Sequence, residues 1–447
     1  MTLDEKLVQI KPSSRQLAFQ ELEFYAFVHF TVNTFTNKEW GDGKESPSIF
    51  NPTQFDPEQW CSAIKSAGMR GLILTCKHHD GFCLWPSKFT NHSISSSPYK
   101  NGKADIVADV SQACKKFGLK FGIYLSPWDR NSKLYGQGKT YDDYFINQLT
   151  ELLTNYGPVF SVWFDGACGE GPNGKKQVYD FPRYYEVIRN LQPQACISVC
   201  GPDVRWCGNE AGHCRETEWS VVPLRTKDTE IIKEKSQQDD SQEFRQRKIS
   251  ACDEDLGSRA ILENEKDLIW YPAEVNTSIR SGWFYHPEED NGVRPLSELI
   301  DIYYKSVGGN ATFLLNIPPT PFGLFHQNDV QRLKEIGDYL NKAFGKSIAK
   351  VDFPSYEHHE NAFLYHLSFD EAEIRHVVLQ EDISKSQRVE SFTLEINQNG
   401  KWESFYNGKV IGYKKIIRLE NPVKGGQIRI KILDCRLEPV LKSIAVY

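Results

Sequence analysis

The sequence predicts an α/β fold in which a (β/α)8-like, TIM-type barrel is followed by an all-β sandwich. Short apolar runs alternate with amphipathic segments of helical period through most of the chain, which is typical of βαβ units and a parallel sheet. After about residue 350 the hydrophobic period changes to two and the helical segments stop. The 447 residues suffice for one barrel plus a smaller domain.

The first four strand and helix pairs, and the strand that follows them, are the clearest. Strands are expected at 24–35, 70–81, 119–129, 158–166 and 195–206, and helices at 56–68, 104–118, 141–157 and 181–193. The helix at 56–68 begins on an aspartate and ends on a glycine, and the helix at 104–118 also ends on a glycine. These caps fix the element boundaries without any knowledge of the tertiary structure.

The alternation pauses between about 215 and 268, in a polar segment that includes KEKSQQDDSQEFRQRK (233–248). It resumes with a weak strand-like run, and the expected elements are a strand at 268–279, a helix at 295–308, a strand at 311–317 and a helix at 328–345. This number of units favours a barrel, distorted at the pause, over an open doubly wound sheet. No GxGxxG follows the first strand, which disfavours a dinucleotide-binding sheet.

The C-terminal segment alternates apolar and polar residues. Phe392, Leu394 and Ile396 fall on one face of a strand at 389–397, and the run at 427–433 alternates isoleucine with basic residues. Turn signals such as NQNGKW separate such runs, so an antiparallel sandwich is expected. We therefore place a barrel domain at 1–348 and a β-sandwich at 349–447.

Composition excludes several classes of function. The chain has 53 basic and 59 acidic residues and no basic run, which argues against a nucleic-acid partner. No apolar run is long enough to span a membrane, and the start MTLDEKLVQI lacks the features of a signal peptide. Eleven cysteines are present, but the cluster between 196 and 214 fits no zinc template, and the redox compartment stays open.

Ionisable and aromatic residues follow the expected strands, at the end where barrels of this type carry their chemistry. They are His29, Glu39 and Trp40 after the first strand, His78, His79 and Trp85 after the second, Tyr124 and SPWDR on the third, Trp163 and Asp165 on the fourth, and Arg205, Trp206 and Glu210 after the fifth. A single strand-end aspartate more often caps a helix or makes a turn. The convergence of five strands on one rim favours a catalytic role for Asp165.

Two carboxylates among hydrogen-bond donors and aromatic rings fit glycoside hydrolysis. That reaction needs one carboxylate near the anomeric carbon and a protonated acid beside the leaving oxygen. Glu216 and Glu218 compete with Glu210 for the acid role, and we interpret them as structural or as residues that support a catalytic group without touching the substrate.

Two other interpretations remain open at this point. The first is a metal-dependent barrel hydrolase, whose ligands would be His29, His78, His79 and Asp165. The second is a non-catalytic carbohydrate-binding protein in which the sandwich holds the sugar.

Several stretches resemble the α-L-fucosidases of glycoside hydrolase family 29, over nearly the whole chain. They are FVHFTVNTFTNKEWGDG, LILTCKHHDGFCLWPSKFT, FGIYLSPWDRN, VWFDGACGEG, GPDVRWCGNEAG and SIRSGWFYH. The NKEWGDG and GPDVRWCGNEAG elements resemble the subfamily that prefers α-1,3/1,4-linked fucose on branched, Lewis-type glycans. Ser386 stands where a glycine is common in the family, and we interpret this as a change in a surface turn.

The resemblance implies a retaining exo-glycosidase with Asp165 as nucleophile and Glu210 as acid/base, the two carboxylates meeting across one pocket at about 5–5.5 Å. Residues matching the fucose-binding positions are His29, His78, His79, Tyr124, Trp163 and Arg205, and further contacts are expected from Glu39, Trp40, Trp85 and Trp283. No cofactor and no metal are implied.

The implied partners are fucosylated oligosaccharides or glycoconjugates. A broad-specificity fucosidase acting on simple or α-1,2-linked fucosides is the alternative. The sandwich would be a carbohydrate-binding-module-like domain. Family resemblance points to a periplasmic or secreted location, although no signal peptide is recognised, and the sequence leaves the oligomeric state open.

Overall fold

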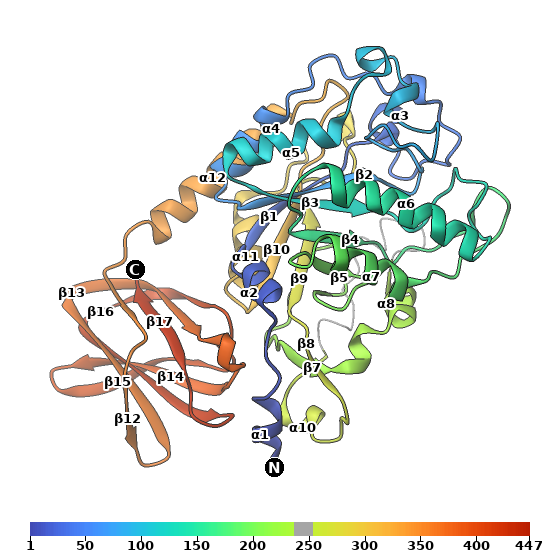
Figure 1. The fold of residues 1–447 in the computed structure, drawn as a ribbon. Helices are drawn as coiled ribbons and strands as arrows, with labels where there is room; N and C mark the ends of the chain where they lie inside the picture. Colours follow the sequence, from blue (N-terminus) through green and yellow to red (C-terminus); the bar gives the residue numbers. More distant parts are fainter. Residues whose placement is uncertain (237–253) are drawn as a thin grey trace.

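The computed structural model describes residues 1–236 and 254–447, so most of the polar segment 233–248 lies outside the described residues. Its larger part is an eight-stranded sheet in the order β5-β4-β3-β2-β1-β10-β9-β6, with all neighbours parallel. A parallel bridge between Ser198 and Val204 links the two ends, so the sheet nearly closes on itself (Figure 1). The predicted barrel is confirmed.

The barrel strands are short and almost wholly buried. Their bounds are β1 (Phe24–Val28), β2 (Gly71–Lys77), β3 (Lys120–Leu125), β4 (Ser161–Phe164), β5 (Cys196–Val199), β6 (Arg205–Trp206), β9 (Ala273–Ser278) and β10 (Ala311–Asn316). Most side chains on both faces are apolar because helices cover the outside and the barrel interior is packed, although β9 also contains the buried polar residues Glu274 and Asn276.

Helices surround this sheet in the predicted order. They are α4 (Pro57–Ser66), α5 (Ile106–Phe117), α6 (Lys139–Asn155), α7 (Phe181–Leu191), α11 (Leu296–Ser306) and α12 (Gln327–Phe344). Asp56 caps α4 by accepting hydrogen bonds from two backbone N–H groups, and Gly118 ends α5 in the left-handed conformation. Shorter helices are α1 (Leu3–Leu7), α2 (Ser14–Gln20), α3 (Val32–Thr36), α8 (Thr229–Lys235) and α10 (Arg259–Leu262).

Three expected strands differ from the structure. The run at 24–35 is a strand only as far as Val28, because Thr31 caps α3. The run at 195–206 is broken into β5 and β6 by a turn after Val199, which has a positive φ of 67°. The run at 268–279 contains β8 (Leu268–Trp270), which pairs with β7 (Val221–Pro223) outside the barrel, and then β9. Only a short turn joins β5 to β6, so the barrel is distorted there.

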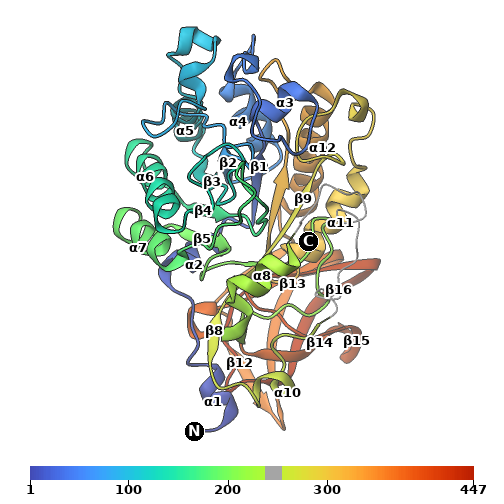
Figure 2. The same ribbon diagram turned by 90° about the vertical axis from the view of Figure 1, so that its right-hand side faces the viewer.

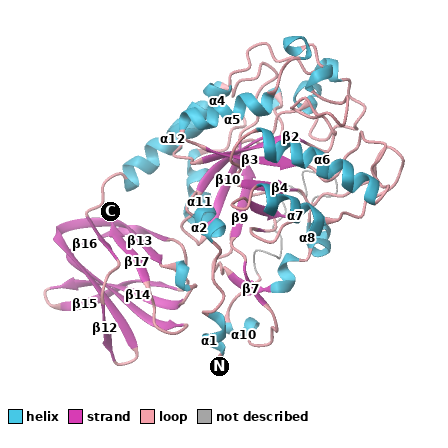
Figure 3. Cartoon of the chain, in the orientation of Figure 1, coloured by secondary structure: helices cyan, strands magenta, loops and turns pink. Residues whose placement is uncertain are grey.

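The C-terminal region is an antiparallel β-structure, as predicted (Figure 3). Its strand order is β11-β17-β13-β16-β14-β15. Its strands are β11 (Ala349–Asp352), β12 (Tyr356–His359), β13 (Ala362–Glu381), β14 (Val389–Gln398), β15 (Lys401–Gly408), β16 (Lys415–Cys435) and β17 (Leu441–Val446). Phe392, Leu394 and Ile396 face its own apolar core. Since α12 ends at Phe344 and β11 begins at Ala349, we keep 348/349 as the proposed domain boundary.

The sandwich packs against the N-terminal side of the barrel strands (Figure 2). Asn310, directly before β10, donates its backbone N–H to the Lys414 carbonyl oxygen and accepts from the Tyr413 N–H at 2.7 Å. Ser386 is buried, with a positive φ of 77°, and its hydroxyl donates to the Ile10 carbonyl at 2.7 Å. The expectation of a surface turn at Ser386 was therefore wrong: it anchors the N-terminal segment.

Within the described residues, no helix is both long and apolar enough to cross a bilayer. The structure likewise contains no disulfide between the cysteines that it describes.

Candidate active site

A pocket lies at the carboxyl ends of the barrel strands and contains about 410 Å³ of space that is free of protein atoms and partly open to solvent. The residues that line it are Phe27, His29, Glu39, Trp40, His78, His79, Trp163, Asp165, Ala167, Glu210, Asn276 and Trp283. Both predicted catalytic carboxylates thus face one pocket. They are brought together because parallel strands present their carboxyl ends at the same rim.

Asp165 directly follows β4, and its side chain is 22% exposed. Its Oδ1 accepts the Ala167 backbone N–H at 2.7 Å, and its Oδ2 accepts the Tyr124 hydroxyl at 3.0 Å. His79 Nε2 lies 3.8 Å from the same Oδ2. The carboxylate is therefore held by donors from the next loop and the neighbouring strand, which explains how an apolar strand tolerates it.

The three predicted site histidines are all buried. Burial lowers the pKa of His29 and of His79 to about 4, even though Asp165 opposes this shift. Burial also holds the pKa of His78 well below its ordinary value. All three imidazoles are consequently neutral at neutral pH and act as hydrogen-bonding groups rather than as cations.

Hydrogen bonds fix two of the imidazole tautomers. The Asn316 amide donates to Ser278 and to the Trp283 carbonyl, so its oxygen accepts from His29 Nδ1 at 2.8 Å. Ser126 donates to the Trp128 carbonyl, so its oxygen accepts from His79 Nδ1 at 2.7 Å. Each ring therefore keeps an unprotonated Nε2, which can accept a hydrogen bond from a sugar hydroxyl.

Adjacent histidines on a regular strand would point to opposite faces. His78 and His79 avoid this because β2 ends at Lys77 and its pairing with β3 is irregular between Thr75 and Lys77. Their ring centroids lie 4.1 Å apart, and both rings line the pocket. A loop delivers both side chains to one site.

Glu210 is half-buried on the loop after β6, and its Oε2 accepts the Trp283 indole N–H at 2.9 Å. Glu39 in turn holds the Trp283 loop. Its carboxylate accepts the backbone N–H groups of Trp283 at 2.8 Å and Phe284 at 3.0 Å, and it lies 2.6 Å from His286 Nε2. Glu39 thus lines the pocket while both of its oxygens shape the loop that contacts Glu210.

Aromatic rings form the other walls. Trp40 is half-buried and packs edge-on against His79 and Trp128. The Trp163 indole donates to Glu274 Oε1 at 2.8 Å, which fixes the plane of its ring. Flat rings with one fixed polar edge suit the apolar face of a sugar.

Some lining residues were not among the sequence predictions: Phe27, Ala167 and Asn276. Glu274, buried beneath Trp163, was missed as well. Asn276 and Glu274 belong to β9, the strand whose sequence signal was weak. In the sequence, the polar Asn276 inside that apolar run was the local feature that could have indicated a pocket residue.

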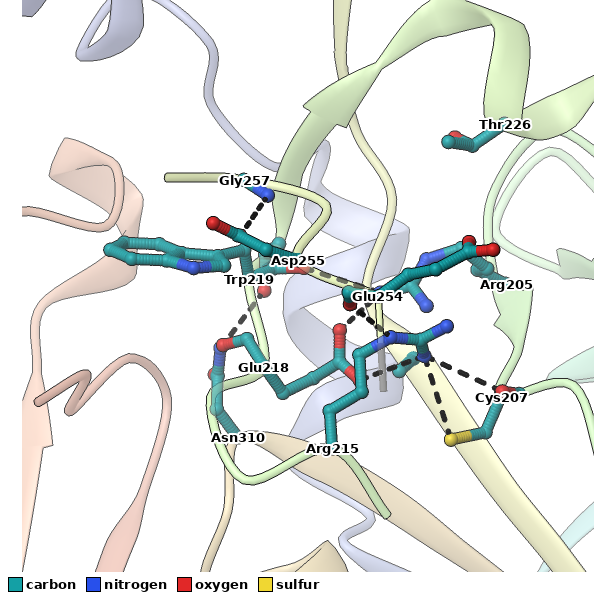
Figure 4. A network of polar contacts seen from close by, with 12 residues as sticks. Arg205, Cys207, Arg215, Glu218, Trp219, Thr226, Glu254, Asp255, Gly257 and Asn310 are labelled. Carbon is teal, nitrogen blue, oxygen red and sulfur yellow. Dashed lines mark hydrogen bonds and ion pairs between the residues drawn. The ribbon is translucent and has the colours of Figure 1, made fainter. Parts of the chain in front are cut away.

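Three predicted sugar contacts are absent from the lining of this pocket. Tyr124 is 1% exposed, and its hydroxyl donates to Asp165 at 3.0 Å. Trp85 is 1% exposed, and its indole donates to Glu151 Oε2 at 2.8 Å. The Arg205 guanidinium donates to Glu218 Oε1 at 2.5 Å, in the polar network of Figure 4. Burial acts to raise the pKa of Glu218, but Arg205 and Arg215 outweigh it and hold that pKa below its ordinary value. Glu218 is thus ionised and unsuited to donate a proton.

Across the described ranges, 1–236 and 254–447, no group of three or more His, Cys, Asp or Glu side chains is arranged to share a metal ion.

The family model for alpha-L-fucosidase matches residues 11–345. The chain belongs to the alpha-L-fucosidase family. It is 37% identical over 470 aligned positions to alpha-L-fucosidase 1 of Arabidopsis thaliana, covering 98% of this chain and 87% of the relative. Membership of this family, glycoside hydrolase family 29, makes the chain a glycosidase of fucosylated glycans, as the motifs predicted.

Solved structures agree in fold. A Bacteroides ovatus protein is 46% identical with a TM-score of 0.88, and the match covers 100% of this chain and 76% of that chain. A glycoside hydrolase 29 family member from an unknown rumen bacterium is 39% identical with a TM-score of 0.81, covering 98% and 77% of the two chains. A Ruminococcus gnavus GH29 fucosidase in complex with fucose is 29% identical with a TM-score of 0.81, covering 98% and 95%.

Proposed function

We propose that this fucosidase is a retaining exo-enzyme in which Asp165 is the nucleophile and Glu210 the general acid/base. Asp165 attacks the anomeric carbon while Glu210 gives its proton to the leaving oxygen. Glu210 then takes a proton from water, and the water oxygen displaces Asp165 from the glycosyl-enzyme. The observation that carries the proposal is that these two carboxylates line one pocket.

The surroundings of Asp165 suit a nucleophile. The Tyr124 hydroxyl and the Ala167 N–H stabilise its ionised form. Because the side chain stays 22% exposed, part of the carboxylate still faces the pocket. The neighbouring His79 is neutral, so no imidazolium competes for the negative charge.

The same pocket suits a fucosyl group. His29 and His79 each offer an Nε2 acceptor to the sugar hydroxyls, and His78 adds a third neutral imidazole. Phe27 and Trp163 provide apolar surface for the methyl group and for the less polar sugar face. Neutral acceptors and flat rings together favour a deoxy sugar over a charged substrate.

We further propose a preference for α-1,3/1,4-linked fucose on branched glycans. The motif resemblance supports this, and so does the half-buried Trp40, which offers a platform for a second sugar at the pocket. Broad activity on simple or α-1,2-linked fucosides is the alternative, and it predicts comparable rates on all linkages.

Variants at the two carboxylates test the mechanism. Asp165→Ala should abolish hydrolysis with an unchanged circular dichroism spectrum. Glu210→Ala should slow the hydrolysis of natural glycans by at least about 100-fold. The hydrolysis of an aryl fucoside with a good leaving group should slow far less. Azide should reactivate the Glu210 variant by displacing Asp165 from the glycosyl-enzyme, and the product should be α-fucosyl azide, with the configuration of the substrate retained. Near-normal turnover by Asp165→Ala, or equal losses on both substrates for Glu210→Ala, would refute the assignments.

A hydrolysis panel tests the linkage proposal. It compares a Lewis-type trisaccharide, an α-1,2-fucosylated trisaccharide and an aryl fucoside under one condition. We expect kcat/KM to be highest, by about 10-fold or more, for the branched α-1,3/1,4 substrate, as one good extra contact would provide. Trp40→Ala should remove this advantage and leave the aryl fucoside nearly unaffected.

A further inference from the structure

The loop that carries Glu210 is closed at its base by a buried cluster of three charges. Arg205 and Cys207 lie where the loop begins, and Arg215 and Glu218 where it ends (Figure 4). Glu218 Oε1 accepts from Arg205 at 2.5 Å, and its Oε2 accepts from Arg215 at 3.3 Å. Arg205, Arg215 and Glu218 are only 5%, 7% and 3% exposed, so water screens these charges little.

Further bonds extend from this cluster toward Glu210. Arg215 donates to the Cys207 carbonyl at 3.4 Å, across the base of the loop. The Asn209 side chain accepts the backbone N–H groups of Ala211 at 3.1 Å and His213 at 3.0 Å. Glu210 therefore lies in a turn that is held by the Asn209 side chain, and the two ends of its loop are joined by the Arg205–Glu218–Arg215 cluster.

The segment after Glu218 is fastened to the C-terminal sandwich. The Glu218 carbonyl accepts from the Asn310 amide at 2.9 Å, and the Ser220 N–H donates to Gln387 Oε1 at 2.8 Å. The Arg436 guanidinium lies 4.1 Å from the centre of the Trp219 ring. The base of the loop is thus fixed from the barrel on one side and from the sandwich on the other.

We propose that the Arg205–Glu218–Arg215 cluster is a positioning device for the acid/base Glu210, and that Arg205 acts through this loop rather than by contacting fucose. The inference rests on the proposed role of Glu210. Arg205 is absent from the pocket lining, and its guanidinium points to Glu218. The sandwich contributes by holding the same segment.

The position of a general acid is demanding. It must lie within about 2.6–3.2 Å of the leaving oxygen, and a misplacement of about 1 Å lowers the rate by roughly 100-fold. Opening the base of the loop should displace Glu210 while leaving Asp165 on β4 and the histidine sites intact. The expected defect is therefore a loss of acid catalysis and not a loss of fucose binding.

Glu218→Gln tests this, because it keeps the side-chain shape and removes the charge between the two guanidiniums. We expect kcat/KM on an α-fucosylated trisaccharide to fall by about 10–100-fold, and kcat/KM on 2-chloro-4-nitrophenyl fucoside, whose leaving group needs no proton, to change by less than about 3-fold. The matched control is Glu216→Gln, which makes the same charge change at an exposed position two residues away and should leave both substrates unchanged.

Arg205→Lys separates positioning from sugar contact. If Arg205 acts by positioning, kcat/KM on the trisaccharide should again fall more than kcat/KM on the aryl fucoside, by a smaller factor than in the Glu218 variant. KM for the aryl fucoside should stay unchanged. A rise in KM that is equal on both substrates would show that Arg205 binds fucose and would overturn the proposal. Should Glu218→Gln fail to fold, the charge-balanced double variant Glu218→Gln/Arg215→Gln takes its place under the same criteria.

Glu210→Gln, measured in parallel, distinguishes the two levels of inference. If Glu210→Gln lowers kcat/KM equally on the trisaccharide and on the aryl fucoside, the proposed acid role itself fails. If Glu210→Gln lowers kcat/KM more on the trisaccharide and the folded Glu218 variant does not, only the positioning proposal fails.

Discussion

Glu274 is a buried carboxyl group inside the barrel, and its titration should be visible in the stability of the protein. It is fully buried beneath Trp163, whose indole donates to Oε1, and the Tyr25 hydroxyl donates to Oε2 at 2.5 Å. Burial raises the pKa of Glu274 from 4.5 to about 7, although both hydrogen bonds act against the shift. In the protonated state Tyr25 can turn its own proton to Thr312, 3.0 Å away.

The sign and size of the effect follow from this shift. Because the folded-state pKa is raised, the contribution is fully present below about pH 4.5 and is lost as the pH rises to about 7. A rise from 4.5 to about 7 corresponds to about 3.4 kcal/mol of unfolding free energy, at about 1.36 kcal/mol per unit. For a domain the size of this barrel, that is a melting-temperature change of about 5 °C.

Glu274→Gln removes the titration and keeps the shape of the protonated acid, since the amide can donate to Tyr25 and accept from Trp163. We expect wild type and variant to melt within about 1 °C of each other near pH 4.5, and the variant to gain about 5 °C by pH 7.5, with a plateau above. Calorimetry across this range measures the difference, with Glu357→Gln at an exposed position as control. A difference that does not change with pH would refute the reasoning.

Three further substitutions have defined outcomes. Gly337→Ala should lower the unfolding free energy by about 1–3 kcal/mol in urea titrations, since the new Cβ would lie 1.8 Å from the Ser66 carbonyl; a stabilised variant would contradict this. Arg280→Met leaves the buried Asp329 without the guanidinium that lies 3.0 Å away, and it should lower the unfolding free energy by about 3–5 kcal/mol near pH 8. The loss should be smaller near pH 5, because burial raises the pKa of Asp329 to about 6 and the carboxyl group is then protonated. Thermal melts that give the same loss of stability at both pH values would argue against this. Trp283→Phe removes the donor to Glu210 and should slow glycan hydrolysis by about 10-fold or more, while unchanged kinetics would show that this bond is dispensable.

Local chemistry made much of the fold predictable. Asp56 and Gly118 cap their helices through contacts within a few residues, so the sequence near each end contains all the information that the end needs. The alternation of Phe392, Leu394 and Ile396 likewise follows from strand geometry alone. The gathering of Asp165 and His79 at one rim needed only the barrel rule and the order of the strands.

Partner choice inside the site required the tertiary structure. Arg205 matched a fucose-binding position and Trp85 was expected as a further sugar contact, but Trp85 pairs with Glu151 on α6 and Arg205 with Glu218 at the base of a loop. Glu39 was expected to touch the sugar and does line the pocket, but the sequence did not indicate that its carboxylate also holds the backbone of Trp283, far away in the sequence. Spacing along the chain gives no distance between such residues.

The sequence by itself therefore determined the order of strands and helices, the sandwich that follows them and the rim at which chemistry gathers, because each depends on backbone periodicity and short-range caps. Only the tertiary structure decided which polar side chains face the pocket and which form their hydrogen bonds with other protein groups around it. The physical reason is that a buried polar group takes whichever partner the packing brings within about 3 Å, and packing joins segments that are remote in the chain.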